Sequence, residues 1–267
     1  MSFDPKSFET LSVETVDEHI WLVTLDRAEV RNAMNTQMGR ELLALWSELY
    51  IDPSLARCVV LTGAGDKAFC AGADLKERNG MTNDDWRRQH ALFEQMVKAQ
   101  GDCPVPIIAA VSGAAYAGGL EIVLGCDFVY AAPNARFALT EVTLGIMPGA
   151  SGTQNLPRAV GVRRAKEIIL TGRPFSAEDA LNWGLANRIS EEGKLIEEAL
   201  DTARAIAGNA PVSVRQAKKS IAASQQMDTK NGYDFEVEAY NRTIVTEDRM
   251  EGILAFNEKR KPVYKGK

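Results

Sequence analysis

Two glutamates stand out in this chain because each lies in apolar sequence close to a glycine-containing turn. Glu121 closely follows Gly118 and Gly119, and Glu141 precedes the turn at 147–149. A carboxylate in an apolar segment is energetically costly unless it is paired or hydrogen-bonded. Two of them beside such turns favour a general acid/base pair. A buried salt bridge or a helix cap is the alternative for each, but no basic residue lies within four positions of either glutamate.

The segment 104–158 contains the elements that must position these glutamates. Residues 105–111 form a short apolar run bounded by prolines and by a Ser-Gly pair, which predicts a fully buried strand. Gly118 and Gly119 then mark a turn, and the apolar segment that carries Glu121 predicts a helix. The free backbone N–H groups at the start of such a helix attract negative charge.

Several helix starts are visible in the flanking sequence. Asn35 is a predicted N-cap for an apolar-faced helix, and Thr82 or Asn83 opens a predicted helix over 82–100. Ser176 begins a predicted capping box. Strand signals fade after residue 191, and helical periodicity continues to about residue 259.

Composition restricts the classes of function. The chain has 267 residues and a net charge of −5, so it has no overall basic field for nucleic acid. No apolar run is long enough to cross a membrane and no signal peptide is visible, so we expect a cytoplasmic protein. The four cysteines lack a C-x-x-C spacing and there are two histidines, so we expect no metal site and assign the acid/base chemistry to carboxylates.

Four motifs in a fixed order resemble the crotonase superfamily and, within it, the enoyl-CoA hydratases. They are FCAGADLK at 69–76, AGGLE at 117–121, the segment 141–149, and GTQ at 152–154. The resemblance covers residues 10–260. It implies an α/β fold, a crotonase-like spiral of ββα units with a helical C-terminal region. We therefore predict a spiral core domain at 1–200 and a helical oligomerisation region at 201–267.

The resemblance also implies a mechanism for adding water to an α,β-unsaturated acyl-CoA thioester. The backbone N–H groups of Ala73 and Gly118 would form an oxyanion hole for the thioester oxygen. Glu121 and Glu141 would hold the attacking water between them, assisted by the N–H of Gly149. Which glutamate carries the proton at rest is left open, because two close carboxylates titrate as a coupled pair.

Coenzyme A would enter as part of the substrate, so no separate cofactor is expected. By resemblance, Phe256 would contact the adenine and Lys259 a phosphate of the CoA held by a neighbouring subunit, which predicts a homo-oligomer, a trimer or a hexamer formed as a dimer of trimers. A solvated basic tail is the alternative for these two residues. The predicted substrate- and CoA-binding set is Arg31, Ala33, Ala71, Asp74, Leu75, Lys76, Phe256 and Lys259.

The predicted acyl pocket includes Trp86, Tyr116 and Thr140. Tyr116 and Ala117 stand where the family commonly has an apolar residue and a further glycine, and Thr140 stands where proline or glutamine is common. These departures argue against a plain fatty-acyl substrate. The chain also resembles bacterial methylthioacryloyl-CoA hydratases of dimethylsulfoniopropionate degradation, which implies hydration with methanethiol release and thioester hydrolysis.

Three alternatives remain for the activity. An enoyl-CoA isomerase of this superfamily needs only the acid at position 141, so the presence of Glu121 favours hydration. An acyl-CoA hydrolase could direct the same activated water at the thioester carbon. An RNA-binding protein is the third alternative, because one related hydratase binds RNA; the net charge of −5 and the absence of interleaved aromatic and basic residues argue against it.

Overall fold

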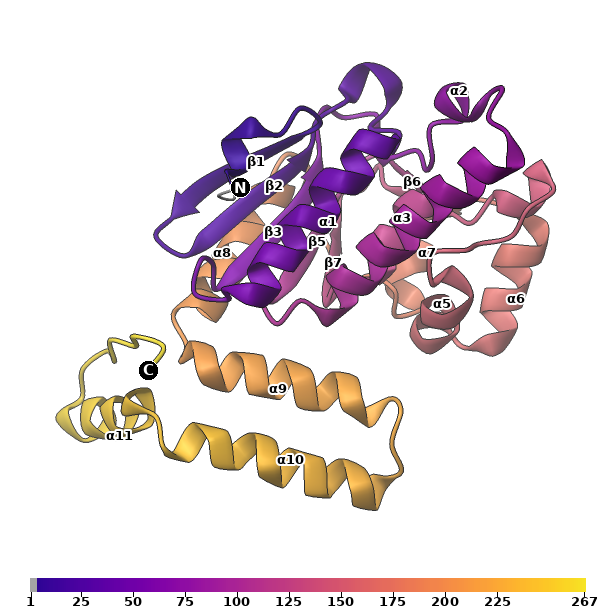
Figure 1. The fold of residues 1–267 in the computed structure, drawn as a ribbon. Helices are drawn as coiled ribbons and strands as arrows, with labels where there is room; N and C mark the ends of the chain where they lie inside the picture. The colour runs from indigo at the N-terminus through magenta and orange to yellow at the C-terminus, as the bar shows by residue number, and fades with distance from the viewer. Residues whose placement is uncertain (1–3) are drawn as a thin grey trace.

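Two β-sheets organise the computed structural model, which describes residues 4–267 (Figure 1). The larger sheet is parallel except at its first pair, β1 and β2, which is antiparallel. Its strand order is β1 (Leu11–Asp17), β2 (Ile20–Leu25), β3 (Cys58–Gly63), β5 (Ile107–Val111), β7 (Phe128–Ala131) and β10 (Arg188–Ile189). This first pair forms a β-hairpin.

The smaller sheet has four strands. Its strand order is β4 (Ala68–Cys70), β6 (Ala114–Tyr116), β8 (Arg136–Ala138) and β9 (Phe175–Ser176), parallel except at β8 and β9. The chain repeatedly adds one strand to each sheet and then turns into a helical segment, as in β3–β4–α2, β5–β6–α4 and β7–β8–η3. This arrangement confirms the predicted α/β spiral of ββα units.

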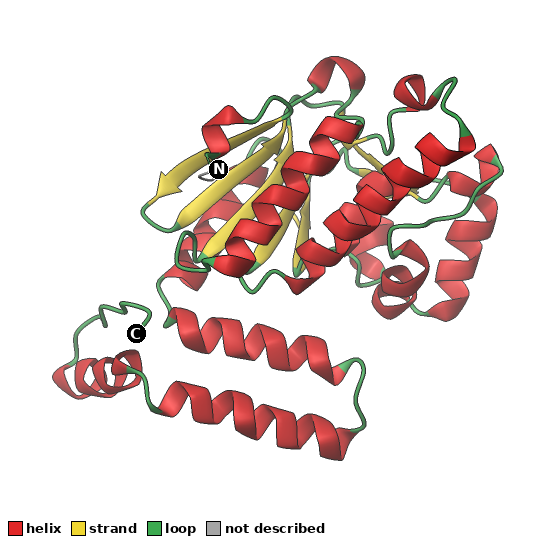
Figure 2. Cartoon of the chain, viewed as in Figure 1, coloured by secondary structure: helices red, strands yellow, loops and turns green. Residues whose placement is uncertain are grey.

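Helices cover the outside of this spiral (Figure 2). The short 3₁₀ turns are η1 (Pro5–Ser7), η2 (Ala28–Val30) and η3 (Glu141–Leu144). The α-helices up to residue 207 are α1 (Thr36–Ile51), α2 (Leu75–Arg78), α3 (Asn83–Asp102), α4 (Gly118–Leu124), α5 (Gly152–Val160), α6 (Val162–Thr171), α7 (Ala177–Asn182) and α8 (Leu195–Ala207).

The large sheet is buried on both faces, which explains the continuous apolar run of its central strand. Every residue of β5 is buried. On one face, side chains such as Leu61 and Ala109 pack in a core with Trp46 of α1 and Met96 of α3. On the other face, a second core joins Ile108 and other sheet residues to α8. A strand covered on both sides cannot alternate apolar and polar residues, because neither face meets water.

Three further helices follow the core: α9 (Pro211–Ser224), α10 (Thr229–Ile244) and α11 (Glu247–Glu258). Figure 1 shows α9 and α10 as a helical hairpin that lies apart from the sheets. The predicted domain boundary at residue 200 falls inside α8, which packs on the large sheet. The division into two domains stays a prediction.

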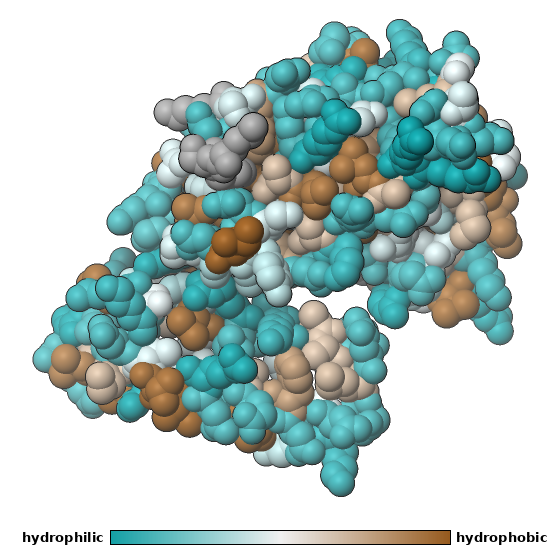
Figure 3. Space-filling view, viewed as in Figure 1, coloured by the Kyte–Doolittle hydropathy of each residue, from teal (hydrophilic) through white to brown (hydrophobic). Residues whose placement is uncertain are grey.

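Apolar side chains gather on the surface of this helical region among hydrophilic ones (Figure 3). Val245 and Phe256 are 85% and 83% exposed. No helix within residues 4–267 is both long enough and apolar enough to cross a membrane.

Candidate active site

The two predicted catalytic glutamates open into one cavity of about 550 Å³. Its walls come from the loop before α2, from α3, from the start of α4, and from η3 with the turn that follows it. The lining residues that matter for the chemistry are Met34, Ala73, Arg78, Trp86, His90, Phe93, Gly118, Glu121, Thr140, Glu141 and Gly149. The ββα spiral therefore brings together residues that lie up to 116 positions apart in the sequence, from Met34 to Ala150.

Glu121 lies on α4, is 4% exposed, and is held by backbone donors. Its Oε1 accepts hydrogen bonds from the N–H groups of Ala150 at 2.7 Å and Gly152 at 2.8 Å. A Cβ at position 152 would lie 2.9 Å from this oxygen, so a glycine is required for the close approach. Burial raises the pKa of Glu121, and the two N–H groups oppose that rise because they stabilise the ionised form.

Glu141 is the first residue of η3 and is 6% exposed, but its surroundings differ. Neither carboxylate oxygen has a hydrogen-bond partner among the described residues. Burial raises the pKa of Glu141 to about 7, and the negative charge of Glu121 contributes to this rise. The backbone N–H of Glu141 itself offsets part of this rise without making a hydrogen bond of normal geometry. The protonated form is therefore favoured at Glu141 rather than at Glu121.

The predicted oxyanion-hole residues, Ala73 and Gly118, lie side by side at the N-terminus of α4. Ala73 forms an isolated parallel bridge with Met34, in which the N–H of Met34 bonds Gly72 and the N–H of Asp74 bonds Met34. In such a bridge the residue between the two bonded neighbours directs its own N–H to the opposite side. A Cβ built on Gly118 would lie 3.9 Å from that Ala73 nitrogen. Gly118 begins α4, where the first N–H groups have no partner within the helix.

Close packing of backbone holds these two loops together. A Cβ at Gly119 would lie 2.2 Å from the carbonyl oxygen of Cys70. Gly72 has φ +97°, and a Cβ there would lie 2.9 Å from the Cβ of Ala117. Ala117 itself has φ 49° and ψ −125°, a region that non-glycine residues rarely adopt. The positions of the Ala73 and Gly118 N–H groups thus depend on a tightly packed crossing of two backbones.

The predicted CoA-binding residues fall into two groups. Ala71 and Leu75 line the cavity beside Ala73. Arg31 and Ala33 belong to the adjoining loop, and the carbonyl of Arg31 accepts the N–H of Ala71 at 3.0 Å.

The other four predicted residues do not line this cavity: Asp74, Lys76, Phe256 and Lys259. The Asp74 carboxylate is engaged by Arg27 and by the first N–H groups of α2. The Lys76 side chain is exposed. Phe256 and Lys259 lie at the end of α11, which Figure 1 places away from the cavity of the same chain.

Of the predicted acyl-pocket residues, Trp86 and Thr140 line the cavity, whereas Tyr116 does not. Tyr116 ends β6, and the next residue, Ala117, does line the cavity. The Tyr116 side chain has no place in the wall of this cavity.

Sequence reasoning missed two cavity residues with polar side chains, His90 and Arg78. The imidazole of His90 lies over Gly149, where a Cβ would come 2.7 Å from the ring, and it approaches Glu94 at 3.2 Å. The buried guanidinium of Arg78 lies 4.2 Å from the ring centroid of Trp86 and donates to Gln89. The spacing of His90 from Glu94 gave no sign of the turn at 147–149 that packs against it. Nothing in the sequence around Arg78 signals a buried position.

Thiol and metal chemistry find little support at this site. Cys70 is fully buried, and burial raises the pKa of its thiol to about 11. Within residues 4–267 there is no cluster of three or more His, Cys, Asp or Glu side chains that could hold a metal ion.

Comparison with known proteins agrees with this geometry. The family model for enoyl-CoA hydratase/isomerase matches residues 15–267, so the chain belongs to that family within the crotonase superfamily. It is 39% identical to the short-chain-enoyl-CoA hydratase of Clostridium acetobutylicum, over 90% of this chain and 92% of that protein. It is 38% identical to the (E)-benzylidenesuccinyl-CoA hydratase of Thauera aromatica, over 94% and 97% of the two chains.

A solved structure shows the same fold. The crystal structure of the enoyl-CoA hydratase from Bacillus anthracis superimposes with a TM-score of 0.94 at 43% identity, covering 97% of this chain and 100% of that one.

Proposed function

We propose that this protein is a hydratase that adds water across the double bond of an α,β-unsaturated acyl-CoA. One observation carries the proposal: two buried carboxylates open into the same cavity, and within residues 4–267 only one of them is held by hydrogen bonds. An environment that separates two pKa values assigns the roles of acid and base. Glu121 is the base in the ionised form, and Glu141 is the acid in the protonated form.

The reaction then follows from the geometry. Glu121 removes a proton from water as the water oxygen bonds to the β-carbon. The electron pair of the double bond moves onto the thioester oxygen, where the N–H groups of Ala73 and Gly118 stabilise the enolate. Loss of one such donor costs roughly 2.7–4 kcal/mol in other enzymes. Glu141 finally delivers its proton to the α-carbon, and the backbone N–H of Gly149 assists in holding the attacking water.

The narrower substrate that we propose is methylthioacryloyl-CoA. Met34, Trp86 and Phe93 line the cavity, and a thioether sulfur makes favourable contacts with aromatic rings of about 0.3–1.5 kcal/mol. Water added at the β-carbon gives a carbon that bears both hydroxyl and methylthio groups. This hemithioacetal loses methanethiol as its hydroxyl becomes a carbonyl, leaving a malonate-semialdehyde thioester. A second water can then hydrolyse the thioester at its carbonyl carbon.

The CoA site is proposed to be completed by a neighbouring copy of the chain. Phe256 is 83% exposed at the end of α11 and lies away from the cavity of its own chain, so an adenine contact requires another subunit. The exposed apolar residues of α10 and α11 support such an assembly. We propose a trimer, or a hexamer of two trimers.

Spectroscopic assays with purified protein test the function and the substrate separately. Loss of absorbance from crotonyl-CoA reports hydration, and a thiol-trapping reagent reports methanethiol release from methylthioacryloyl-CoA. We expect both, with faster turnover of the methylthio substrate at equal concentration. Crotonyl-CoA hydration without methanethiol release would support the proposed hydratase activity and contradict methylthioacryloyl-CoA as its substrate. Migration of a 3-enoyl double bond without hydration would instead identify an isomerase.

A further inference from the structure

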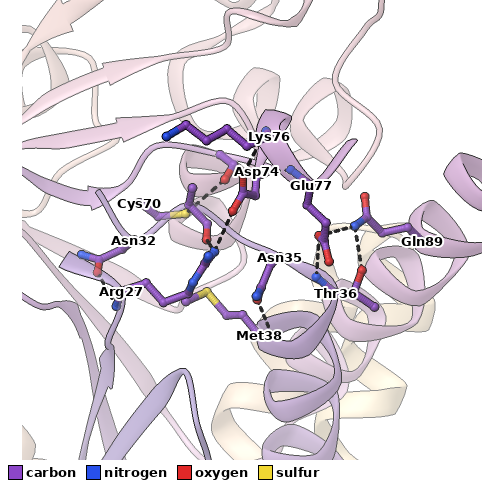
Figure 4. A network of polar contacts seen from close by, with 12 residues as sticks. Arg27, Asn32, Asn35, Thr36, Met38, Cys70, Asp74, Lys76, Glu77 and Gln89 are labelled. Atoms are coloured by element: carbon purple, nitrogen blue, oxygen red, sulfur yellow. Dashed lines mark hydrogen bonds and ion pairs between the residues drawn. The ribbon is translucent and has the colours of Figure 1, made fainter. Parts of the chain in front are cut away.

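A partly buried ion pair joins Arg27 to Asp74, the residue that follows Ala73 (Figure 4). The Nη1 of Arg27 lies 3.0 Å from the Oδ2 of Asp74, and the two side chains are 18% and 10% exposed. The same Nη1 donates to the carbonyl oxygen of Ala33 at 2.5 Å. One guanidinium nitrogen therefore ties the loop at 26–35 to the residue that follows Ala73.

Asp74 uses its other carboxylate oxygen to begin α2. Its Oδ1 accepts the N–H groups of Lys76 at 3.0 Å and Glu77 at 3.3 Å, which makes it the N-cap. Burial alone would raise the pKa of Asp74, but the hydrogen bonds from Arg27 and from these N–H groups outweigh it and hold the pKa below the usual value. The carboxylate is thus ionised and fixed at both oxygens.

The ion pair is coupled to the Ala73 N–H through the backbone. Asp74 donates its own N–H to the carbonyl of Met34 at 2.9 Å, and Met34 donates to Gly72 at 2.7 Å. Ala73 lies between these two bonds. A shift of Asp74 relative to the loop at 26–35 must therefore rotate the peptide that carries the Ala73 N–H.

The far end of α2 is anchored independently. The carboxylate of Glu77 accepts the N–H of Thr36 at 2.9 Å and the side-chain amide of Gln89 at 2.7 Å, also visible in Figure 4. Loss of the Arg27 contact would consequently release the start of α2, next to Ala73, without freeing the whole segment.

We propose that Arg27 is a positioning residue: through Asp74 it fixes the direction of the Ala73 N–H and so sets how strongly the site polarises the thioester carbonyl of its substrate. The inference rests on the proposed function, in which that N–H holds the oxygen. It predicts a loss in kcat rather than in substrate affinity, because the affected hydrogen bond strengthens in the transition state.

Two variants separate the ion pair from the helix cap. Arg27→Gln removes the charge of the donor. Asp74→Asn keeps an N-cap, since asparagine caps helices as well as aspartate, but its NH₂ group cannot accept from Arg27. We expect each variant to lower kcat for crotonyl-CoA by about 10- to 100-fold, the scale of a misplaced catalytic group. KM should change less than about threefold. The double variant should lose no more than either single one, because both remove the same contact.

A spectroscopic readout distinguishes positioning from general destabilisation. The absorption of a conjugated thioester such as 2,4-hexadienoyl-CoA moves to longer wavelength when its carbonyl is polarised by hydrogen bonds. Recorded by stopped-flow mixing before hydration proceeds, this shift should be clear in the unmodified protein and at least halved in both variants.

A second ion pair in the same chain provides a matched control. The Nζ of Lys218 lies 2.7 Å from Asp127 and 2.9 Å from the carbonyl of Val105, with side chains 17% and 27% exposed. This pair also joins a cation to one carboxylate and one backbone carbonyl, but neither residue lines the catalytic cavity. Lys218→Gln should lower the unfolding midpoint about as much as Arg27→Gln and leave the absorption shift intact.

Each outcome decides the question. A full absorption shift in Arg27→Gln, or a double variant whose losses multiply, would overturn the positioning role. No shift in the unmodified protein would overturn it as well, because the Ala73 N–H would then not hold the carbonyl. A protein that shows the shift but hydrates no enoyl-CoA would instead contradict the proposed hydratase and leave the role of Arg27 supported.

Discussion

Glu121 and Glu141 share one cavity but hold their carboxylates in opposite ways. Two backbone N–H groups bond Glu121, whereas both oxygens of Glu141 lack any hydrogen-bond partner among the described residues. An unpartnered carboxylate that is 6% exposed is tolerated only if it carries a proton or receives a ligand. This unequal hydrogen bonding is the basis for proposing Glu121 as the proton acceptor and Glu141 as the proton donor.

The first prediction concerns the two glutamates themselves. Glu121→Gln and Glu141→Gln keep the shape of each side chain and remove its capacity for proton transfer. We expect each to lower kcat by about 10²–10⁴-fold, the usual contribution of an acid or base. Binding of a saturated acyl-CoA, measured by calorimetry, should change far less. Turnover within a few-fold of the unmodified protein in either variant would contradict the paired mechanism.

A second prediction concerns the pH dependence of catalysis. In the proposed mechanism Glu141 must be protonated for hydration, and its pKa is raised to about 7. The value of kcat/KM should therefore fall as the pH rises through about 7, and it should fall again at low pH as Glu121 becomes protonated. A pH profile with crotonyl-CoA measures both limbs. A rate that stays constant from pH 6 to pH 9 would show that Glu141 is not the acid.

The same pKa makes a third prediction about stability. Between the ordinary value of 4.5 and about 7, the folded protein keeps a proton on Glu141 that the unfolded chain has released. The free energy of unfolding must fall as the pH rises through this window, by roughly 3 kcal/mol in total. Glu141→Gln lacks this dependence. Urea unfolding at pH 5 and pH 8 measures this difference. The free energy of unfolding of the variant, relative to that of the unmodified protein, should be higher at pH 8 than at pH 5.

A fourth prediction tests assembly. Lys259→Ala should raise KM more than it lowers kcat, because Lys259 is proposed to contact a phosphate of CoA, remote from the reacting carbons. Light scattering should show a trimer or hexamer for both proteins. Lys261→Ala, two residues further on, is the matched control and should leave KM unchanged. A fully active monomer at micromolar concentration would contradict the proposal that two subunits share the CoA site.

Local signals in the sequence were sufficient for much of the fold. Asn35, Thr82 and Ser176 cap helices as predicted, because a cap depends on a side chain and the N–H groups two or three residues away. The continuous apolar run at 105–111 was read as a buried strand for the same local reason. The packing of α8 on the sheet was not predicted, because its buried face is defined by strands far away in sequence.

For the candidate site, the residues could be predicted from the sequence, but their hydrogen-bond partners could not. Glu121, Glu141, Ala73 and Gly118 could be named from motifs, yet the unequal hydrogen bonding of the two acids depends on the turn at 150–152 folding back onto α4. Asp74 was predicted to bind CoA, whereas its carboxylate is engaged by a loop more than 40 residues earlier. Tertiary contacts of this kind leave no local pattern.

The strained backbone at Ala117 gives the two oxyanion loops a shared evolutionary constraint. Its methyl group occupies the space that a Cβ at Gly72 would need, at a separation of 2.9 Å. Its φ of 49° is one that a glycine would adopt without strain, and such a conformation costs on the order of 1–3 kcal/mol in other residues. The alanine at position 117 therefore lowers the stability of the fold relative to glycine. Its methyl group fills the space between the loop that carries Gly72 and the start of α4. Position 72 must therefore stay glycine, because both the methyl group at position 117 and the φ of +97° at position 72 exclude a side chain there.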